Sequence, residues 1–208
     1  MHTTKWRTVP HTAYKEMTML HSDYRPLCAV VLPYRERRHY MHSFDLAKPV
    51  MREGYEDYLE PVTALCRAAG ATHGIAHMTV DEKLVEAGRS QRRPRPHVDG
   101  RFMPEAQHWG HQPGPGPSWL HYCNDIGRGP IARMAVIVAA SVAGCRAWRG
   151  TFDGQPAIDG DLTHIADQLG DGEVLPANVG YLLSPDCVHE SMLFAEDTRR
   201  TFLRIALP

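Results

Sequence analysis

The stretch GYLLSPDCVHESMLFAEDTRRTFLRIAL, residues 180–207, contains three short apolar runs separated by polar turns. We predict strands over 180–183, 188–192 and 201–207, because each run is short and the first is followed by a Ser-Pro-Asp turn. Short strands that follow one another through turns, without long helices between them, are typical of a β-sandwich or a jelly roll.

The remaining sequence extends this pattern. It contains no GxGxxG motif, no P-loop and no alternation of strands with long helices, which disfavours a parallel α/β fold. The region 34–42 is basic and aromatic, and we interpret it as a solvated turn. Pro61 either kinks the longer helix or starts a second one, and Gly70 is its expected C-terminal cap. We predict further strands at 27–32, 72–80, 83–85, 131–140 and 147–152, and helices at 50–70 and 162–169.

The composition bounds the class of protein. With 208 residues, 43% of them apolar, the chain can form a single domain over 1–208: an N-terminal elaboration over 1–70 packed on a β core over 71–208. The net charge of −1 provides no global basic field for nucleic acid. Five scattered cysteines without a CxxC pair indicate reduced thiols in a cytoplasmic protein. The longest apolar run, 134–144, is about half the length of a membrane span.

Thirteen histidines raise the question of which have the spacing of metal ligands. His97 and Asp99 form a His-x-Asp pair, and residues i and i+2 of an extended strand point to the same face. His189, on a later predicted strand, would complete two imidazoles and one carboxylate. This ligand set leaves coordination positions open and is typical of non-haem Fe(II) oxygenases.

The sequence after His189 adds a second feature. About ten residues downstream, Arg199-Arg200-Thr201 opens the last predicted strand. This pattern resembles that of the Fe(II)/2-oxoglutarate-dependent oxygenase superfamily. The resemblance implies a mainly β fold with flanking helices, built on a double-stranded β-helix (a cupin-like jelly roll). It also implies Fe(II), 2-oxoglutarate and O2 as cofactor and cosubstrates, and hydroxylation of a C–H bond.

The resemblance also implies an arginine that binds the distal carboxylate of 2-oxoglutarate, assisted by Thr201. We favour Arg199, because it shares a strand face with Thr201, Leu203 and Ile205, and we expect this apolar face to line the barrel interior. Arg200 and Arg204 are the alternatives, since a bulge would exchange the two faces.

Other residues are candidates for cosubstrate or substrate contacts. They are Tyr122, Asn124 and Arg133, together with His108 and Trp109 in the Gly/Pro-rich loop 103–118, which has the composition of a lid. The basic segment 91–95 precedes His97 and would suit an anionic substrate such as a nucleic-acid backbone.

The substrate is left open by these patterns. The neutral charge favours a small molecule, an amino acid or a peptidyl side chain, and no membrane partner is expected. One alternative is a nucleobase hydroxylase of the same superfamily acting on DNA or RNA. Another is a cupin-type metalloenzyme that does not use 2-oxoglutarate, and a third is a β-sandwich that binds without catalysis. The patterns do not indicate an oligomeric state.

Overall fold

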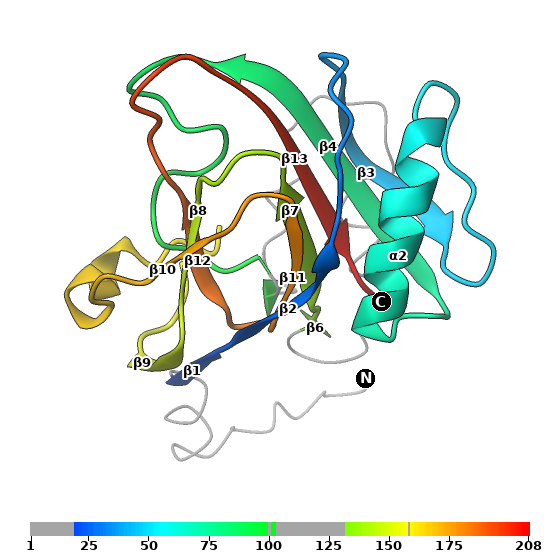
Figure 1. Cartoon of the computed structure of the whole chain (residues 1–208). Helices are drawn as coiled ribbons and strands as arrows, with labels where there is room; N and C mark the ends of the chain where they lie inside the picture. Colours follow the sequence, from blue (N-terminus) through cyan, green and yellow to red (C-terminus); the bar gives the residue numbers. More distant parts are fainter. Residues whose placement is uncertain (1–18, 100, 103–131, 158) are drawn as a thin grey trace, which may run out of the picture.

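The structure, a computed structural model, describes residues 19–99, 101–102, 132–157 and 159–208. The chain forms a mainly β antiparallel sandwich, as predicted, with a large sheet facing a smaller one (Figure 1). The large sheet is antiparallel throughout and contains, in spatial order, β2 (Tyr24–Ala29), β11 (Val179–Leu183), β7 (Val136–Ala140), β13 (Thr198–Ala206), β4 (Ile75–Val85) and β3 (Arg38–Asp45).

The smaller sheet is extended along one edge by the segment that carries His97. Its three strands are, in order, β10 (Glu173–Leu175), β8 (Cys145–Trp148) and β12 (Val188–Ser191). The N–H of Ser191 donates to the carbonyl of Arg93 (2.9 Å), and His97 pairs with His189. Two short ribbons complete the described strands: β1 (Met19–Ser22) with β9 (Gly150–Asp153), and β5 (Arg101–Phe102) with β6 (Ala132–Arg133).

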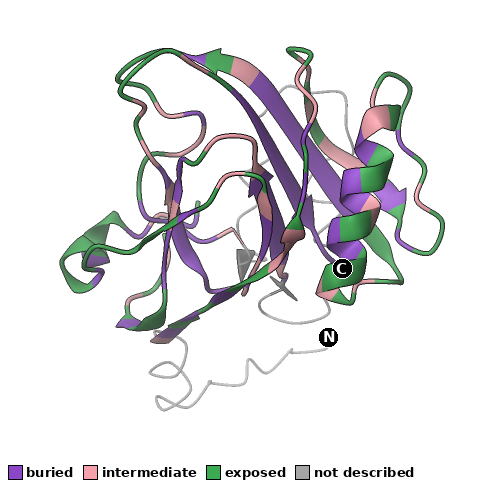
Figure 2. Ribbon diagram, viewed as in Figure 1, coloured by how far each residue is buried: buried purple, intermediate pink, exposed green. Residues whose placement is uncertain are grey.

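The strand β13 is buried on both faces (Figure 2). Phe202 and Ala206 belong to a hydrophobic cluster with Ala147 of the smaller sheet. Leu203 and Ile205 belong to another cluster, on the side of the large sheet that faces away from the smaller one. Because side chains alternate along a strand, Arg200, Phe202 and Arg204 face the interior of the sandwich. We call this side of the large sheet the inner face.

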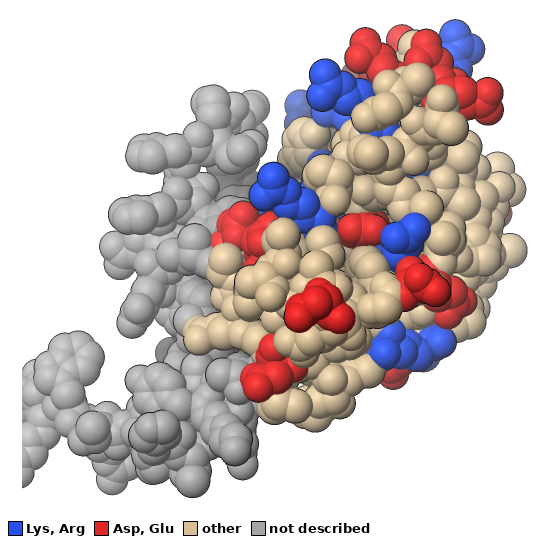
Figure 3. Space-filling model, turned by 90° about the vertical axis from the view of Figure 1, so that its left-hand side faces the viewer, with Lys and Arg blue, Asp and Glu red and all other residues tan. Residues whose placement is uncertain are grey.

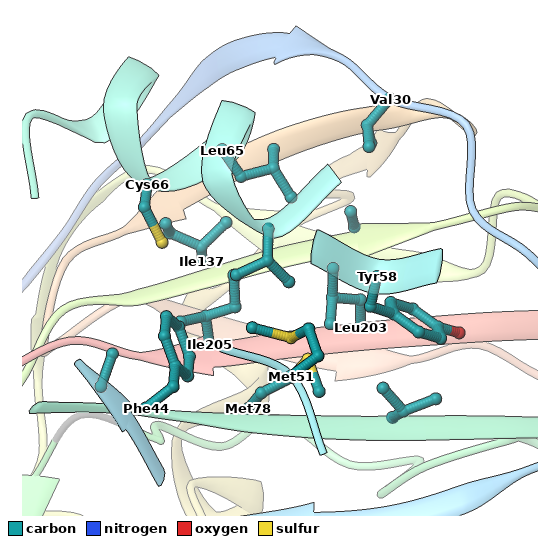
Figure 4. Close-up of a cluster of buried hydrophobic side chains, with 14 of the residues drawn as sticks. Val30, Phe44, Met51, Tyr58, Leu65, Cys66, Met78, Ile137, Leu203 and Ile205 are labelled. Atoms are coloured by element: carbon teal, nitrogen blue, oxygen red, sulfur yellow. The ribbon is translucent and has the colours of Figure 1, made fainter. Parts of the chain in front are cut away.

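The outer face of the large sheet is covered by the helix α2 (Leu59–Ala69), which follows the 3-10 turn η1 (Glu56–Tyr58). Its apolar residues pack against Ile137, Leu203 and Ile205 (Figure 4). The predicted cap is confirmed, because Gly70 follows the helix with a φ of 80°. Pro61 neither kinks the helix nor starts a second one: it lies in the first turn, where no backbone N–H is needed for an intrahelical bond.

Two predictions about the strands were wrong. The region 34–42 was interpreted as a solvated turn, but β3 begins at Arg38 and pairs with β4. The strands predicted over 72–80 and 83–85 are one continuous strand, β4, although it includes two acidic residues. Both acids are buried, and they remain in the strand because each finds cationic or hydrogen-bonding partners.

Glu82 shows how a buried acid is satisfied on the outer face. Its Oε1 accepts hydrogen bonds from Arg37 Nη2 (2.9 Å) and from the Tyr58 hydroxyl (2.7 Å). Its Oε2 accepts the backbone N–H of Arg37 (2.9 Å). Arg37 also pairs with Asp57 (2.8 Å). These contacts join the segment before β3, the turn before α2 and the middle of β4.

The other predicted elements differ mainly in their bounds. The strand predicted over 27–32 begins earlier, as β2, and the one over 147–152 is divided between β8 and β9. The predicted helix 162–169 is the 3-10 helix η3 (Thr163–Gln168). None of the described helices is long and apolar enough to cross a membrane. The cysteines that the structure describes are free thiols: Cys28, Cys66, Cys145 and Cys187.

Candidate metal centre

His97 and His189 are brought together by backbone pairing. The N–H of each residue donates to the carbonyl of the other, both at 3.0 Å. Residues that are directly opposite in antiparallel strands present their side chains on the same face. The two imidazole rings therefore lie side by side, with centroids 4.3 Å apart.

The orientation of both rings is set by carbonyl groups behind them. His97 Nδ1 lies 2.7 Å from the carbonyl oxygen of Arg95, and His189 Nδ1 lies 3.0 Å from that of Cys187. A carbonyl only accepts hydrogen bonds, so each Nδ1 carries a hydrogen, and the other ring nitrogen, Nε2, is the one that lies on the side of Asp99. This is the arrangement in which an imidazole Nε2 binds a metal ion.

Asp99 completes the group, two residues after His97. Its Oδ1 lies 3.9 Å from His97 Nε2, and its Oδ2 lies 3.7 Å from His189 Nε2. One ligand atom from each of the three residues lies within 4.8 Å of the others. Ligand atoms that share one ion at about 2.1 Å are about 3–4 Å apart. The three groups could therefore hold a metal ion after a small movement.

The protonation states in the metal-free protein suit a cation. Burial and the neighbouring His189 lower the pKa of His97 to about 3, so this imidazole is neutral at pH 7. Burial acts to raise the pKa of Asp99, but Arg204 and the two imidazoles outweigh it and hold that pKa well below its usual range. A neutral imidazole and an ionised carboxylate are both ready to bind a metal without losing a proton.

Arg204 is the cation closest to the carboxylate. It lies on the inner face of β13, and its Nε is 3.1 Å from Asp99 Oδ2. Both side chains have little exposure to solvent, at 8% for Arg204 and 22% for Asp99. In such surroundings an arginine fixes the orientation of a carboxylate, as outer partners of metal ligands generally do.

The prediction that Arg199 faces the metal group was wrong. Arg199 is exposed and lies on the outer face of β13, opposite Leu84. Thr201 is buried on the same outer face, where its hydroxyl donates to the carbonyl of Pro33. The strand has no bulge against β4, so the alternation that directs Arg204 inward directs Arg199 and Thr201 outward.

The other candidate residues are not tested by the structure. Tyr122, Asn124, His108 and Trp109 lie outside the described residues, as does the loop 103–118. The backbone of Arg133 belongs to β6, but its side chain is not among those described.

Sequence reasoning missed two polar residues of the inner face, Arg38 and Asp81, whereas Arg92 belongs to the basic segment 91–95 that it singled out for an anionic substrate. Arg38 and Asp81 are paired across β3 and β4, and Arg92 reaches them from the segment before His97. The signal available in the sequence was the spacing of Asp81 and Lys83, which places both side chains on one face of a strand. It could be used only if both residues were known to lie in one strand.

The chain was compared with models of known protein families, with curated proteins and with solved structures, and no match was found. The fold and the site therefore define the class by themselves. The chain is a mainly β antiparallel sandwich with a buried His-Asp-His group, which resembles an HxD...H metal site and could hold a metal ion.

Proposed function

We propose that this protein is an Fe(II)- and 2-oxoglutarate-dependent oxygenase that hydroxylates an unactivated C–H bond. The observation that carries the proposal is the buried group of His97, Asp99 and His189, assembled from a His-x-Asp pair and a distant histidine. Two imidazoles and one carboxylate leave coordination positions open, which suits iron that must also bind a cosubstrate and O2. The iron and its cosubstrate would supply the oxidising chemistry.

The order of the strands supports a double-stranded β-helix. A jelly roll is formed when the chain crosses repeatedly between two facing antiparallel sheets. Here the chain passes from the large sheet to the smaller one, or back, at nearly every step: β4, then the His97 segment, β7, β8 and β10, β11, β12, and β13. This connectivity would bring the metal ligands to the interior from the smaller sheet and an arginine from the larger one.

For the distal carboxylate of 2-oxoglutarate we propose Arg204 in place of Arg199. Arg204 is the inward arginine beside Asp99. Its guanidinium has five N–H donors, so Nε can face Asp99 while the two Nη atoms face a second carboxylate. Arg200 is also inward, but its Nε donates to the carbonyl of Val142 (2.8 Å) and its Nη1 donates to Gln91.

The protein would contribute orientation and a dry environment. Ala147, which pairs with His189 in the smaller sheet, is buried in one hydrophobic cluster with Phe202 and Ala206 of the facing sheet. Such surroundings strengthen the interaction of charged groups with a metal and limit side reactions with water.

The test is reconstitution without oxygen. Fe(II) and 2-oxoglutarate should together produce a visible charge-transfer absorption with the wild-type protein, and O2 should then yield succinate. His189→Ala should abolish iron binding. Arg204→Met should weaken 2-oxoglutarate binding by about 2–4 kcal/mol. A protein that binds one iron, yet shows neither the absorption nor succinate, would exclude this function.

One observation favours a second candidate. Arg204 already faces Asp99, so the metal group could belong to a cupin-type metalloenzyme that does not use 2-oxoglutarate. Stoichiometric iron without 2-oxoglutarate binding would support that candidate.

A nucleobase substrate receives less support than a small molecule, an amino acid or a peptidyl side chain. On the face seen in Figure 3, acidic and basic side chains are mixed over the described residues. A surface that binds a nucleic-acid backbone concentrates basic residues. The net charge of −1 also provides no overall attraction for nucleic acid, and we therefore propose a small-molecule, amino-acid or peptidyl substrate.

A further inference from the structure

The guanidinium group of Arg92 lies beside the inner face, and no carboxylate of the described residues lies within hydrogen-bond distance of it. Its Cζ lies 5.5 Å from the centre of the Tyr40 ring and 5.6 Å from that of Phe202. Among the described residues the nearest carboxylate oxygen is Asp81 Oδ2, with Nη1 at 3.8 Å, which is beyond a hydrogen bond. The Arg92 side chain is 30% exposed to solvent.

Asp81 has an arginine beside each carboxylate oxygen, and Oδ2, the one nearer Arg92, has no hydrogen-bond partner among the described residues. The carboxylate of Asp81 already pairs with Arg38, whose Nε lies 2.9 Å from Oδ1. Two guanidinium groups therefore accompany one carboxylate, and the more distant of them is Arg92. Aromatic rings stabilise a guanidinium by contact with its face, while its N–H donors point outward in the guanidinium plane.

The charged side chains around Arg92 also carry a net positive charge. Among the described residues around the inner face of β4 and β13, five cationic side chains accompany two carboxylates, an excess of three positive charges. Divalent iron and a doubly negative 2-oxo acid would cancel each other, so the excess remains in the loaded enzyme. The cations are Arg38, Lys83, Arg92, Arg200 and Arg204, and the carboxylates are Asp81 and Asp99.

The separation between Arg92 and the metal group can be estimated from the spacing of residues along β13. Phe202, under its guanidinium, is two residues from Arg204 on the same face, which corresponds to about 7 Å along the strand. Arg204 contacts Asp99. A molecule bound to Arg92 at one end would need to extend roughly 10 Å along the inner face to bring a C–H bond to the metal.

We infer that Arg92 recognises an anionic group, a carboxylate or a phosphate, on a small organic substrate. This inference rests on the proposed oxygenase function and specifies its substrate class. A guanidinium binds either anion through two parallel N–H···O bonds. The rings of Tyr40 and Phe202 would hold the guanidinium in place and reduce the entropy lost on binding.

The experiment uses the full chain loaded with Fe(II) and 2-oxoglutarate, and measures the stimulation of succinate formation. The probes are pairs that differ only in charge: amino acids and their amides for the carboxylate, and nucleoside monophosphates and nucleosides for the phosphate. The variants are Arg92→Met and Arg92→Lys, with Arg89→Met, an exposed arginine of the same connection, as the control.

The anionic member of one pair should stimulate succinate formation and its neutral partner should not. Which pair responds identifies the anion. Arg92→Met should raise the KM for that probe ten- to hundredfold, Arg92→Lys should recover part of the loss, and Arg89→Met should match the wild type. Equal stimulation by charged and neutral partners, no stimulation by any probe, or an Arg92→Met variant like the control would overturn the inference. Slow succinate formation without substrate reports separately on the proposed function, and the control Arg89→Met should leave it unchanged.

Discussion

The buried imidazole of His97 makes the metal-free protein sensitive to mild acid. Its pKa is lowered from 6.5 to about 3, so the folded protein keeps His97 neutral while the unfolded chain protonates it below pH 6.5. The unfolded state then binds more protons, and the free energy of unfolding falls as the pH falls from about 6.5 to about 3. Above pH 6.5 the contribution is fully present.

The size of the effect follows from this shift. Each pH unit below the pKa of the unfolded chain costs about 1.4 kcal/mol, so one such histidine costs roughly 2 kcal/mol between pH 7 and pH 5. Asp99 does not enter this window. Because its pKa is lowered, Asp99 stabilises the folded protein above pH 3.8, and this contribution is lost only at lower pH.

The assay is urea unfolding of the metal-free protein, with a chelator present, at pH 7 and pH 5. The wild type should lose about 2 kcal/mol more than His97→Gln, whose amide does not titrate. His39 and His77 also have lowered pKa values because of burial, and the comparison with the variant cancels their contributions. Equal losses in both proteins, within about 0.5 kcal/mol, would refute a neutral, buried His97 and with it the geometry of the site.

Three substitutions test other parts of the structure. Glu82→Gln removes the buried carboxylate beneath α2 and should lower the free energy of unfolding by about 3 kcal/mol, whereas Glu86→Gln, at an exposed position, should change it little in the same urea titration. Gly180→Ala should cost about 1–3 kcal/mol, because the added Cβ would collide with Leu65 of α2; an unchanged thermal midpoint would contradict that packing. Arg199→Ala should change neither stability, within about 0.5 kcal/mol, nor the affinity for 2-oxoglutarate in a binding titration, and a tenfold loss of affinity would restore Arg199 to the site.

The pairing of the ligands could be anticipated from the sequence for a local reason. His97 and Asp99 are two residues apart, so any extended segment presents them together. Their pairing with His189 is a long-range contact, and it was inferred only because the downstream pattern resembled a known arrangement. The backbone bonds between His97 and His189 now give that contact a physical basis.

The elements that sequence reasoning missed depend on long-range partners. β3 is basic and aromatic and has no strand signal of its own, yet it pairs along β4, where Arg38 meets Asp81. The acids of β4 divided the predicted strand in two, because an isolated buried carboxylate is costly. Their partners come from other segments of the chain, so nothing near them in the sequence could reveal that they were satisfied.

The wrong face assignment of β13 has a more general cause. We expected the apolar face, with Leu203 and Ile205, to line the interior, as it does when a barrel encloses only a hydrophobic core. In this chain a helix covers the outer face of the large sheet, so that face must also be apolar. An interior that holds a carboxylate ligand needs compensating cations, so the face with Arg200 and Arg204 is the one that turns inward. In β13, which is buried on both sides, the face with charged residues is the one that lines the interior of the sandwich. The apolar face is the one that packs against the helix.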